Sequence, residues 1–114
     1  MLAKTPEPPY WTVIFTSLRT GDNVGYGAMA ESMEALARQQ DGFLGIDSAR
    51  DGVGITVSYW RDPAAIEAWR NNIEHRIARQ LGRERWYEAY ELRVAKVERA
   101  YAWQRDDGLK DPQA

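Results

Sequence analysis

The feature that most constrains this chain is its first strand-like segment, YWTVIFTSL, which runs from Tyr10 to Leu18. The segment is rich in β-branched and aromatic residues and contains neither glycine nor proline, a composition typical of a β-strand. Alternate residues of a strand point to opposite faces, and here both faces carry large apolar groups. The strand therefore needs an apolar layer against each face, which a single sheet covered on one side does not provide.

A helix is indicated after this strand. Apolar residues recur at spacings of three and four between Tyr26 and Ala37, which predicts one apolar helix face. We expect Asp22 or Asn23 to cap the start of this helix, because short polar side chains accept hydrogen bonds from the free N–H groups there. Gly42 is expected to stop it.

A hairpin follows the helix. Residues 43–50 and 55–60 are rich in strand-forming residues and flank an Asp51-Gly52 pair. An Asp-Gly pair between two such runs predicts a tight turn that joins antiparallel strands.

The next segment predicts a second, interrupted helix. Asp62 is its expected cap and Pro63 its first residue, a position where proline costs no hydrogen bond. Asn71, with Glu74 three residues later, forms a capping box that predicts a break and a restart. The restarted helix is expected to reach about Trp86.

The last strand is predicted to run from about Tyr90 to Trp103. Its apolar alternation changes phase on the way, which indicates an extra residue and predicts a β-bulge near Ala95 and Lys96.

The element order is strand, helix, strand, strand, helix, strand. This order predicts an α+β, ferredoxin-like fold, in which a four-stranded antiparallel sheet carries its helices on one face. Residues 10–103 would form this one domain, between flexible tails at residues 1–9 and 104–114. Because the first strand is apolar on both faces, we expect a homodimer whose sheets pack together through their bare faces.

Composition excludes several classes of function. The chain has no cysteine and one histidine, so we expect no disulfide, no Cys-type zinc site and no His-rich metal site. Its 15 basic and 17 acidic residues are interleaved, which argues against nucleic acid as a partner. No apolar run approaches the ~18 residues of a membrane span, and the N-terminal stretch lacks the apolar region of a signal peptide. A cytoplasmic protein without membrane contact is expected.

Three stretches carry a resemblance to a known family: DGFLG, GITVSYWRDPAAIEAWRNNIEHR and GRERWYEAYELRVAKVERAY. Together they resemble the antibiotic biosynthesis monooxygenase (ABM) domain family, over about residues 10–103. The most specific piece is Tyr59-Trp60, followed by a short helix ending in Trp69 and then by His75. The resemblance implies a dimeric α/β barrel. It also implies either oxygenation of polycyclic phenols or quinols without metal or flavin, or the binding or degradation of haem.

The haem-degrading branch of that family relies on an asparagine in the first strand, a tryptophan and a histidine. Trp69 matches the tryptophan, but the first strand offers Phe15, Thr16 and Ser17, and Arg79 stands where the histidine would fall. The resemblance therefore favours a cofactor-independent monooxygenase that acts on a small aromatic or quinol-type substrate, with no cofactor. The alternative is a non-enzymatic module that binds a hydrophobic ligand or haem, with haem degradation less favoured.

His75 and Trp69 are the candidate catalytic residues. A deprotonated phenol can itself give an electron to O₂, so such a site needs an aromatic pocket and a base, for which histidine is suited near neutral pH. If Ile73 and Ile77 face the sheet, His75 points to the helix edge, where it is either a partly exposed bystander or a base at the pocket. Trp69 is either core packing or a pocket wall whose indole N–H orients the substrate.

Four further residues are candidates for substrate binding. Arg79 is either an exposed surface arginine or a group that stabilises a phenolate. The other three are aromatic: Tyr59, Trp86 and Tyr90.

Overall fold

The structure is a computed structural model, and it describes residues 2–105. Its elements in chain order are β1 (Tyr10–Arg19), α1 (Tyr26–Arg38), β2 (Phe43–Asp51), β3 (Val53–Trp60), α2 (Pro63–Asn71), α3 (Ile73–Leu81), the π-helical turn η1 (Gly82–Trp86) and β4 (Tyr87–Val97). Met1 and the part of the expected C-terminal tail from residue 106 onward lie outside the described residues.

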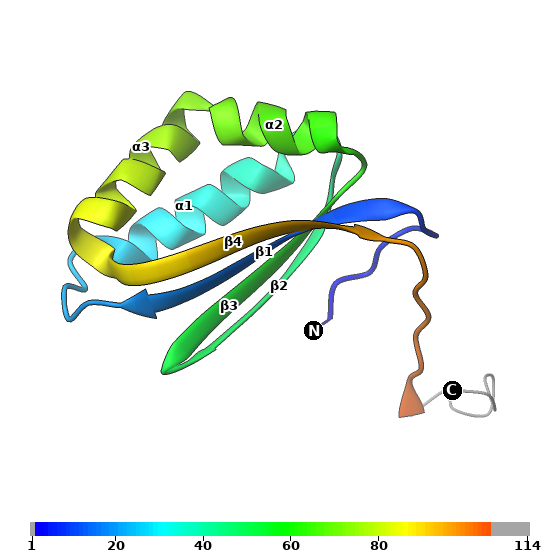
Figure 1. Ribbon diagram of the computed structural model, residues 1–114, viewed down its shortest axis with the longest axis horizontal. Helices are drawn as coiled ribbons and strands as arrows, with labels where there is room; N and C mark the ends of the chain where they lie inside the picture. Colours follow the sequence, from blue (N-terminus) through cyan, green and yellow to red (C-terminus); the bar gives the residue numbers. More distant parts are fainter. Residues whose placement is uncertain (1, 106–114) are drawn as a thin grey trace.

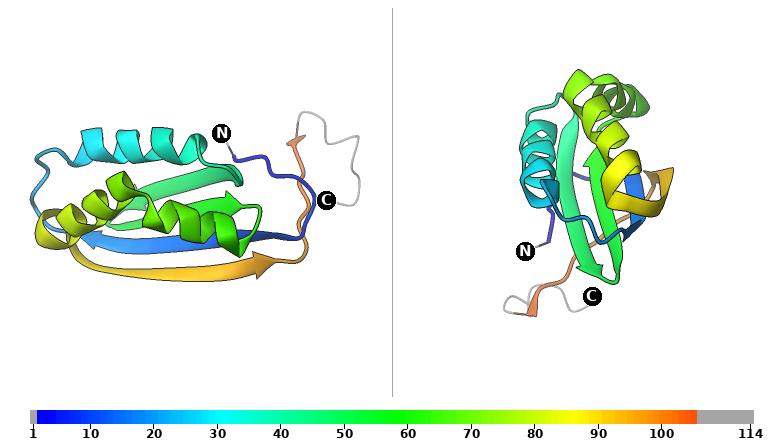
Figure 2. Two further views of the ribbon diagram at one scale, coloured as in Figure 1. Left: turned by 90° about the horizontal axis from the view of Figure 1, so that it is seen from above. Right: turned by 90° about the vertical axis from the view of Figure 1, so that its left-hand side faces the viewer.

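The four strands form one antiparallel sheet in the order β2-β3-β1-β4. The helices lie on one face of it, so the predicted ferredoxin-like α+β fold is confirmed (Figure 1). Seen from above, α1 and the α2–α3 pair lie side by side across the strands (Figure 2). Among residues 2–105, no helix lies on the opposite face of the sheet.

Register decides which side chains face the helices. Trp60 lies opposite both Trp11 and Phe43, so these three residues share the helix-covered face. Trp60 is 0% exposed and is the largest fully buried side chain. The core of the described chain is therefore centred where β3 runs toward α2.

Two local predictions are confirmed. The strands of the hairpin meet through Gly52, whose φ of 78° lies in the left-handed region that glycine adopts without strain. Asp62 caps α2 by accepting a hydrogen bond from the backbone N–H of Ala65 at 2.8 Å, and Pro63 is the first helical residue. The sequence signals at these two positions act through neighbours only a few residues away.

The predicted ends of α1 are wrong. The N-cap is Gly25, at φ 76°, and no side chain caps the helix. The Asp22 Oδ1 atom instead accepts a hydrogen bond from the backbone N–H of Val24, and the Asn23 side chain accepts one from Arg19. Both side chains therefore stabilise the loop and are not free to cap the helix. At the other end, the helix stops at Arg38, before the expected glycine stop.

The predicted break in the second helical segment is confirmed, but its cap is one residue later. Asn72, and not Asn71, accepts the first N–H groups of α3. The α-helix then ends at Leu81, and the remaining stretch to Trp86 widens into η1.

The bulge predicted near Ala95 and Lys96 is wrong. The ladder between β1 and β4 runs without interruption through both residues, and the irregularity lies at the other end, where Glu88 is the extra residue. β4 ends at Val97, well before Trp103. The change of alternation phase therefore marked the end of the strand.

Apolar side chains remain on the bare face of the sheet. Leu18, Val53 and Ile55 are 44%, 45% and 46% exposed there. The N-terminal segment crosses part of this face, and the Ala3 N–H donates to the Asp47 carboxylate at 2.7 Å. In the described part of the chain, no helix is long and apolar enough to cross a membrane.

Candidate functional site

A stack of aromatic rings connects the sheet to the break between α2 and α3. Trp69, near the end of α2, lies over Trp60 with ring centroids 6.1 Å apart and an interplanar angle of 26°. His75 covers the other side of Trp69 at 4.2 Å and 14°. The two candidate catalytic residues are thus in direct face-to-face contact.

The helix break is what brings these two rings together. The Asn72 side-chain oxygen accepts the backbone N–H groups of Glu74 at 3.0 Å and His75 at 3.3 Å. In an uninterrupted α-helix, residues six apart point in different directions. The extended backbone of Asn72 changes the direction of the chain, and His75 folds back over Trp69.

The surroundings of His75 set its protonation state. Its Nδ1 atom lies 3.0 Å from the Trp69 carbonyl oxygen, which can only accept, so we assign the ring proton to Nδ1. Burial lowers the pKa of His75 below 6.5; the Trp69 carbonyl opposes this shift and the charge of Arg79 adds to it. At neutral pH the ring is therefore neutral, with a free lone pair on Nε2.

Arg79 lies one helical turn beyond His75, in a group of positive charges. Its Nη2 atom donates to the Arg70 carbonyl oxygen at 3.3 Å, while its Nε atom is buried with no partner among the described residues. Burial lowers the pKa of Arg79, and the charges of Arg70, Arg83 and Arg76 lower it further. We call these four residues the arginine cluster.

The orientation of α3 differs from the sequence expectation. Ile77 is 51% exposed and does not pack under the helix, whereas His75 and Arg79 are half-buried. The expectation that Ile77 faces the sheet is wrong, and His75 is more sheltered than Ile77. The half-buried side of α3 carries His75, Ala78, Arg79 and Leu81.

A second aromatic cluster lies near the start of β4. Phe15 contacts Tyr87 and Tyr90, with ring centroids 5.4 Å and 5.1 Å apart. The Tyr87 hydroxyl donates to that of Tyr26 at 3.3 Å, and the Arg19 guanidinium lies 3.4 Å from the Tyr26 ring centroid. Burial, reinforced by this hydroxyl contact, raises the pKa of Tyr87, so that phenol stays protonated.

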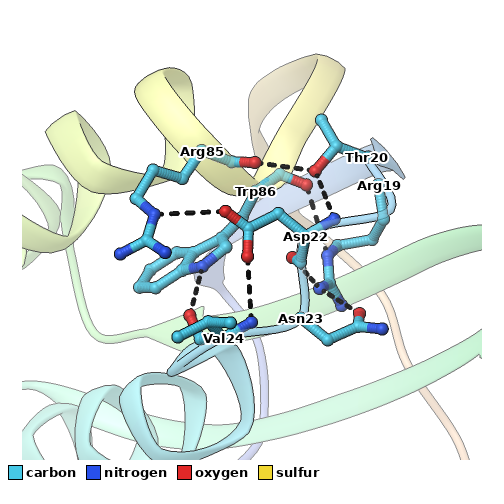
Figure 3. A network of polar contacts seen from close by, with 7 residues as sticks. All are labelled: Arg19, Thr20, Asp22, Asn23, Val24, Arg85 and Trp86. Atoms are coloured by element: carbon cyan, nitrogen blue, oxygen red, sulfur yellow. Dashed lines mark hydrogen bonds and ion pairs between the residues drawn. The ribbon is translucent and has the colours of Figure 1, made fainter.

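Trp86 is a buried residue whose polar atom is engaged in a hydrogen bond within the fold. It is 4% exposed, and its indole N–H donates to the Val24 carbonyl oxygen at 2.9 Å. It belongs to a network between the loop after β1 and the turn before β4 that Figure 3 shows. The network's other members are Arg19, Thr20, Asp22, Asn23 and Arg85.

Tyr59 lies on the bare face of the sheet. It is adjacent to Trp60 in β3, and neighbouring residues of a strand point to opposite faces. Its hydroxyl donates to Asp47 at 3.0 Å, and its ring meets Tyr10 edge to face. Burial, aided by the Asp47 carboxylate, raises the pKa of Tyr59 to about 12. Tyr59 does not share a site with Trp69 and His75.

The structure thus brings Trp69, His75 and Arg79 together. Tyr90 is connected to this group through Arg83, whose Nη1 atom lies 3.5 Å from the Tyr90 hydroxyl. Sequence reasoning missed Trp60 as the base of the stack. The strand alternation could have indicated it, because Trp60 shares a face with Ser58 and not with Tyr59. Within residues 2–105, no three His, Cys, Asp or Glu side chains gather in a way that could hold a metal ion.

Comparison with known proteins identifies the family. The profile of the family described as antibiotic biosynthesis monooxygenase (ABM) matches residues 27–81. The protein YqjZ of Bacillus subtilis (strain 168) is 53% identical over 105 residues, which cover 90% of this chain and 92% of that protein. The chain belongs to the antibiotic biosynthesis monooxygenase family.

Two further proteins are similar. The jasmonate monooxygenase ABM of Pyricularia oryzae (strain 70-15 / ATCC MYA-4617 / FGSC 8958) is 32% identical over 76 residues, which cover 63% of this chain but only 35% of that protein. SnoaB of Streptomyces nogalater, described as a cofactor-independent oxygenase, superposes with a TM-score of 0.70 at 12% identity. That superposition covers 82% of this chain and 97% of SnoaB, and it supports the same fold.

Proposed function

We propose that this protein is a cofactor-independent monooxygenase that acts on a small aromatic or quinol-type substrate. The observation that carries the proposal is the contact between Trp69 and His75, in which the Trp69 carbonyl holds the imidazole proton on Nδ1. The free Nε2 atom is then available to accept a phenolic proton. The family and the similarity of the fold to SnoaB, a cofactor-independent oxygenase, support the same class of reaction.

The reaction needs a base and an aromatic surface. His75 accepts the proton of the substrate hydroxyl, and the Trp69 carbonyl stabilises the imidazolium that forms. The resulting phenolate transfers one electron to O₂, and the substrate radical and superoxide combine into a peroxide at a ring carbon that bears hydrogen. Loss of water leaves a quinone: one oxygen atom of O₂ is in the product and the other is in water. The substrate supplies all the electrons.

Trp69 and Arg79 take supporting roles in this proposal. Trp69 stacks on Trp60 and on His75, so it holds the imidazole in place and offers a substrate its ring edge; aromatic pairs of this kind contribute about 0.5–1.5 kcal/mol beyond the burial of area. The Arg79 guanidinium favours the phenolate by its charge. Trp86 and Tyr59 are left out, because each side chain is engaged elsewhere.

We further propose that the protein works as a homodimer whose sheets pack through the face that bears Leu18, Val53 and Ile55. A cytoplasmic location remains a prediction from the sequence.

Oxygen uptake with a dihydroxynaphthalene as probe tests the proposed reaction. We expect one quinone per O₂ consumed and, with isotope-labelled O₂, one labelled atom in each quinone. Trp69→Phe should lower turnover while retaining most of the packing volume, and Trp103→Phe, at an exposed position, is the matched control. Binding of the probe without oxygen uptake would favour the alternative, a non-enzymatic module for a hydrophobic ligand or haem. A shift of the haem absorbance on titration with haemin separates those two ligands.

A further inference from the structure

We propose that the substrate of this site is an aromatic acid, and that the arginine cluster holds its carboxylate beside the ring stack. The inference rests on the proposed function and names the chemical class of its substrate. It is carried by Arg76, Arg79 and Arg83, which line an open hollow on α3, and by Arg70, whose carbonyl oxygen accepts from Arg79.

The residues that line the hollow belong to α3 and η1. The hollow measures about 390 Å³ and is lined by Arg76, Ile77, Arg79, Gln80 and Arg83. Ile77 is half exposed, so the hollow offers one apolar wall among its cationic groups. A small molecule with a hydrocarbon part and an acidic group matches this combination.

The charges in the cluster are uncompensated. Within the described residues, none of the four arginines has a carboxylate within ion-pair distance, although Arg38, Arg61, Arg85 and Arg93 all do. The carboxylate nearest in sequence, Glu84, accepts from Gln80 instead. Like charges held together without a counter-ion repel one another, so a bound anion would relieve an existing cost.

Arg79 shows this cost most clearly. Its Nε–H group is buried without an acceptor, and a buried polar group without a partner destabilises the folded chain. Guanidinium groups present their donors in a planar fork that fits the two oxygens of a carboxylate. A carboxylate at this position would neutralise the cluster.

The arginine cluster is linked to the ring stack through neighbouring residues of α2 and α3. Arg79 follows His75 by four residues on α3, and Arg70 follows Trp69 directly on α2. On its other side, Arg83 reaches the Tyr90 hydroxyl at 3.5 Å. A ligand anchored by its acid on Arg79 would therefore lie one helical turn from His75, whose pKa already responds to the charge of Arg79.

Calorimetric titration with naphthaleneacetate and its neutral amide tests the inference without requiring turnover. We expect the purified protein to bind the acid about tenfold more tightly than the amide, as a charge-assisted contact predicts. Affinity for the acid should fall as salt rises from about 0.05 to about 0.5 M, while affinity for the amide should not. Equal affinities for acid and amide, or no binding of the acid, would overturn the inference.

Variants assign the effect to the cluster. Arg79→Gln and Arg83→Gln should each remove most of the preference for the acid and leave the amide unaffected, and Arg79→Lys should restore part of it. Arg38→Gln on α1 is the matched control, because it removes one exposed arginine outside the hollow. Loss of both ligands together in a variant that melts normally would contradict a charge-specific role, as would inorganic phosphate that binds as tightly as the aromatic acid.

The outcomes separate this inference from the proposed function. If the protein prefers the acid but consumes no oxygen with any phenol, the arginine site would be supported and the proposed monooxygenase activity would be contradicted. Oxygen uptake with a neutral dihydroxynaphthalene, together with equal affinities for the acid and the amide, would do the reverse.

Discussion

The role proposed for His75 as a base depends on its environment as much as on its residue type. The Trp69 carbonyl fixes the proton on Nδ1, and burial keeps the ring neutral at physiological pH. The same contact would stabilise the charged ring once a proton arrives. A single hydrogen bond thus selects both the reactive nitrogen and its tautomer.

His75→Gln should lower turnover by ~10²-fold or more, the usual contribution of a positioned general base. In the unmodified protein, the rate should fall on the acid side as His75 becomes protonated, at a pKa below 6.5. The variant should lose that ionisation. The measurement is the turnover number against pH for both proteins, and an unchanged acid limb in the variant would assign the ionisation to another group.

The same residue should couple folding to pH. Because the pKa of His75 is lower in the folded chain than 6.5, protonation favours the unfolded chain. The contribution of His75 to the free energy of unfolding should therefore be fully present above about pH 6.5. It should decrease below that pH, as the pH approaches the lowered pKa. Urea unfolding at about pH 7.5 and about pH 5.5 should show this decrease, and His75→Gln should reduce it.

The side to which His75 points could not be predicted from the sequence. The cap lies at Asn72 where the sequence pattern favoured Asn71, and the side of α3 that packs depends on contacts with elements far away in the sequence. Both asparagines are good caps, so local propensity does not choose between them. The position of Trp69 on α2 did not raise this ambiguity, because Asp62 and Pro63 define where α2 begins.

At the scale of elements, the break between α2 and α3 acts on the site. Asn72→Ala removes the acceptor for two N–H groups and should cost about 1 kcal/mol of stability. It should also disturb the contact between Trp69 and His75, visible as a changed near-ultraviolet circular dichroism spectrum and a lower turnover.

Asp62→Ala is the matched control for that experiment. It removes a cap of similar strength at the start of α2 but leaves the break intact. A similar loss of stability with normal turnover and spectrum is expected. If the two variants behaved alike in all three measurements, the break would have no specific role in the site.

The elements differed in how well local sequence determined them. The hairpin and the start of α2 followed short-range signals, Asp51-Gly52 and Asp62-Pro63, and were predicted correctly. The end of β4 did not, because apolar alternation continues through Tyr101 and Trp103 although pairing with β1 stops at Val97. Strand length depends on the partner strand, which lies far away in the sequence.

At the scale of the whole molecule, the two-sided apolar pattern of β1 was the most informative feature. It required cover on both faces, and the helices provide cover on only one. Which face receives the helices was not predictable, because Val13 and Ile14 are equally suited to either. The placement of Tyr59 away from the stack follows from that choice.

Ile55→Asp should weaken association if the bare face forms the dimer interface, because it introduces a charge among Leu18 and Val53. Sedimentation velocity at micromolar concentration should show the unmodified protein as a dimer and the variant shifted toward the 13.1 kDa chain. Leu92→Asp, at an exposed apolar residue on the other face, should leave association unchanged. A monomeric unmodified protein would contradict the proposal.

The ring stack at the helix break has a consequence for how such sites change during evolution. A tryptophan and a histidine six positions apart form no surface on a straight helix, so neither residue alone predisposes a chain to this chemistry. An interrupting asparagine could join them in one mutational step, and a later loss of that asparagine could separate them again while both aromatic residues persist. Related chains that keep the pair but lack an interrupting cap would then be former enzymes, recognisable by the residue between the two rings.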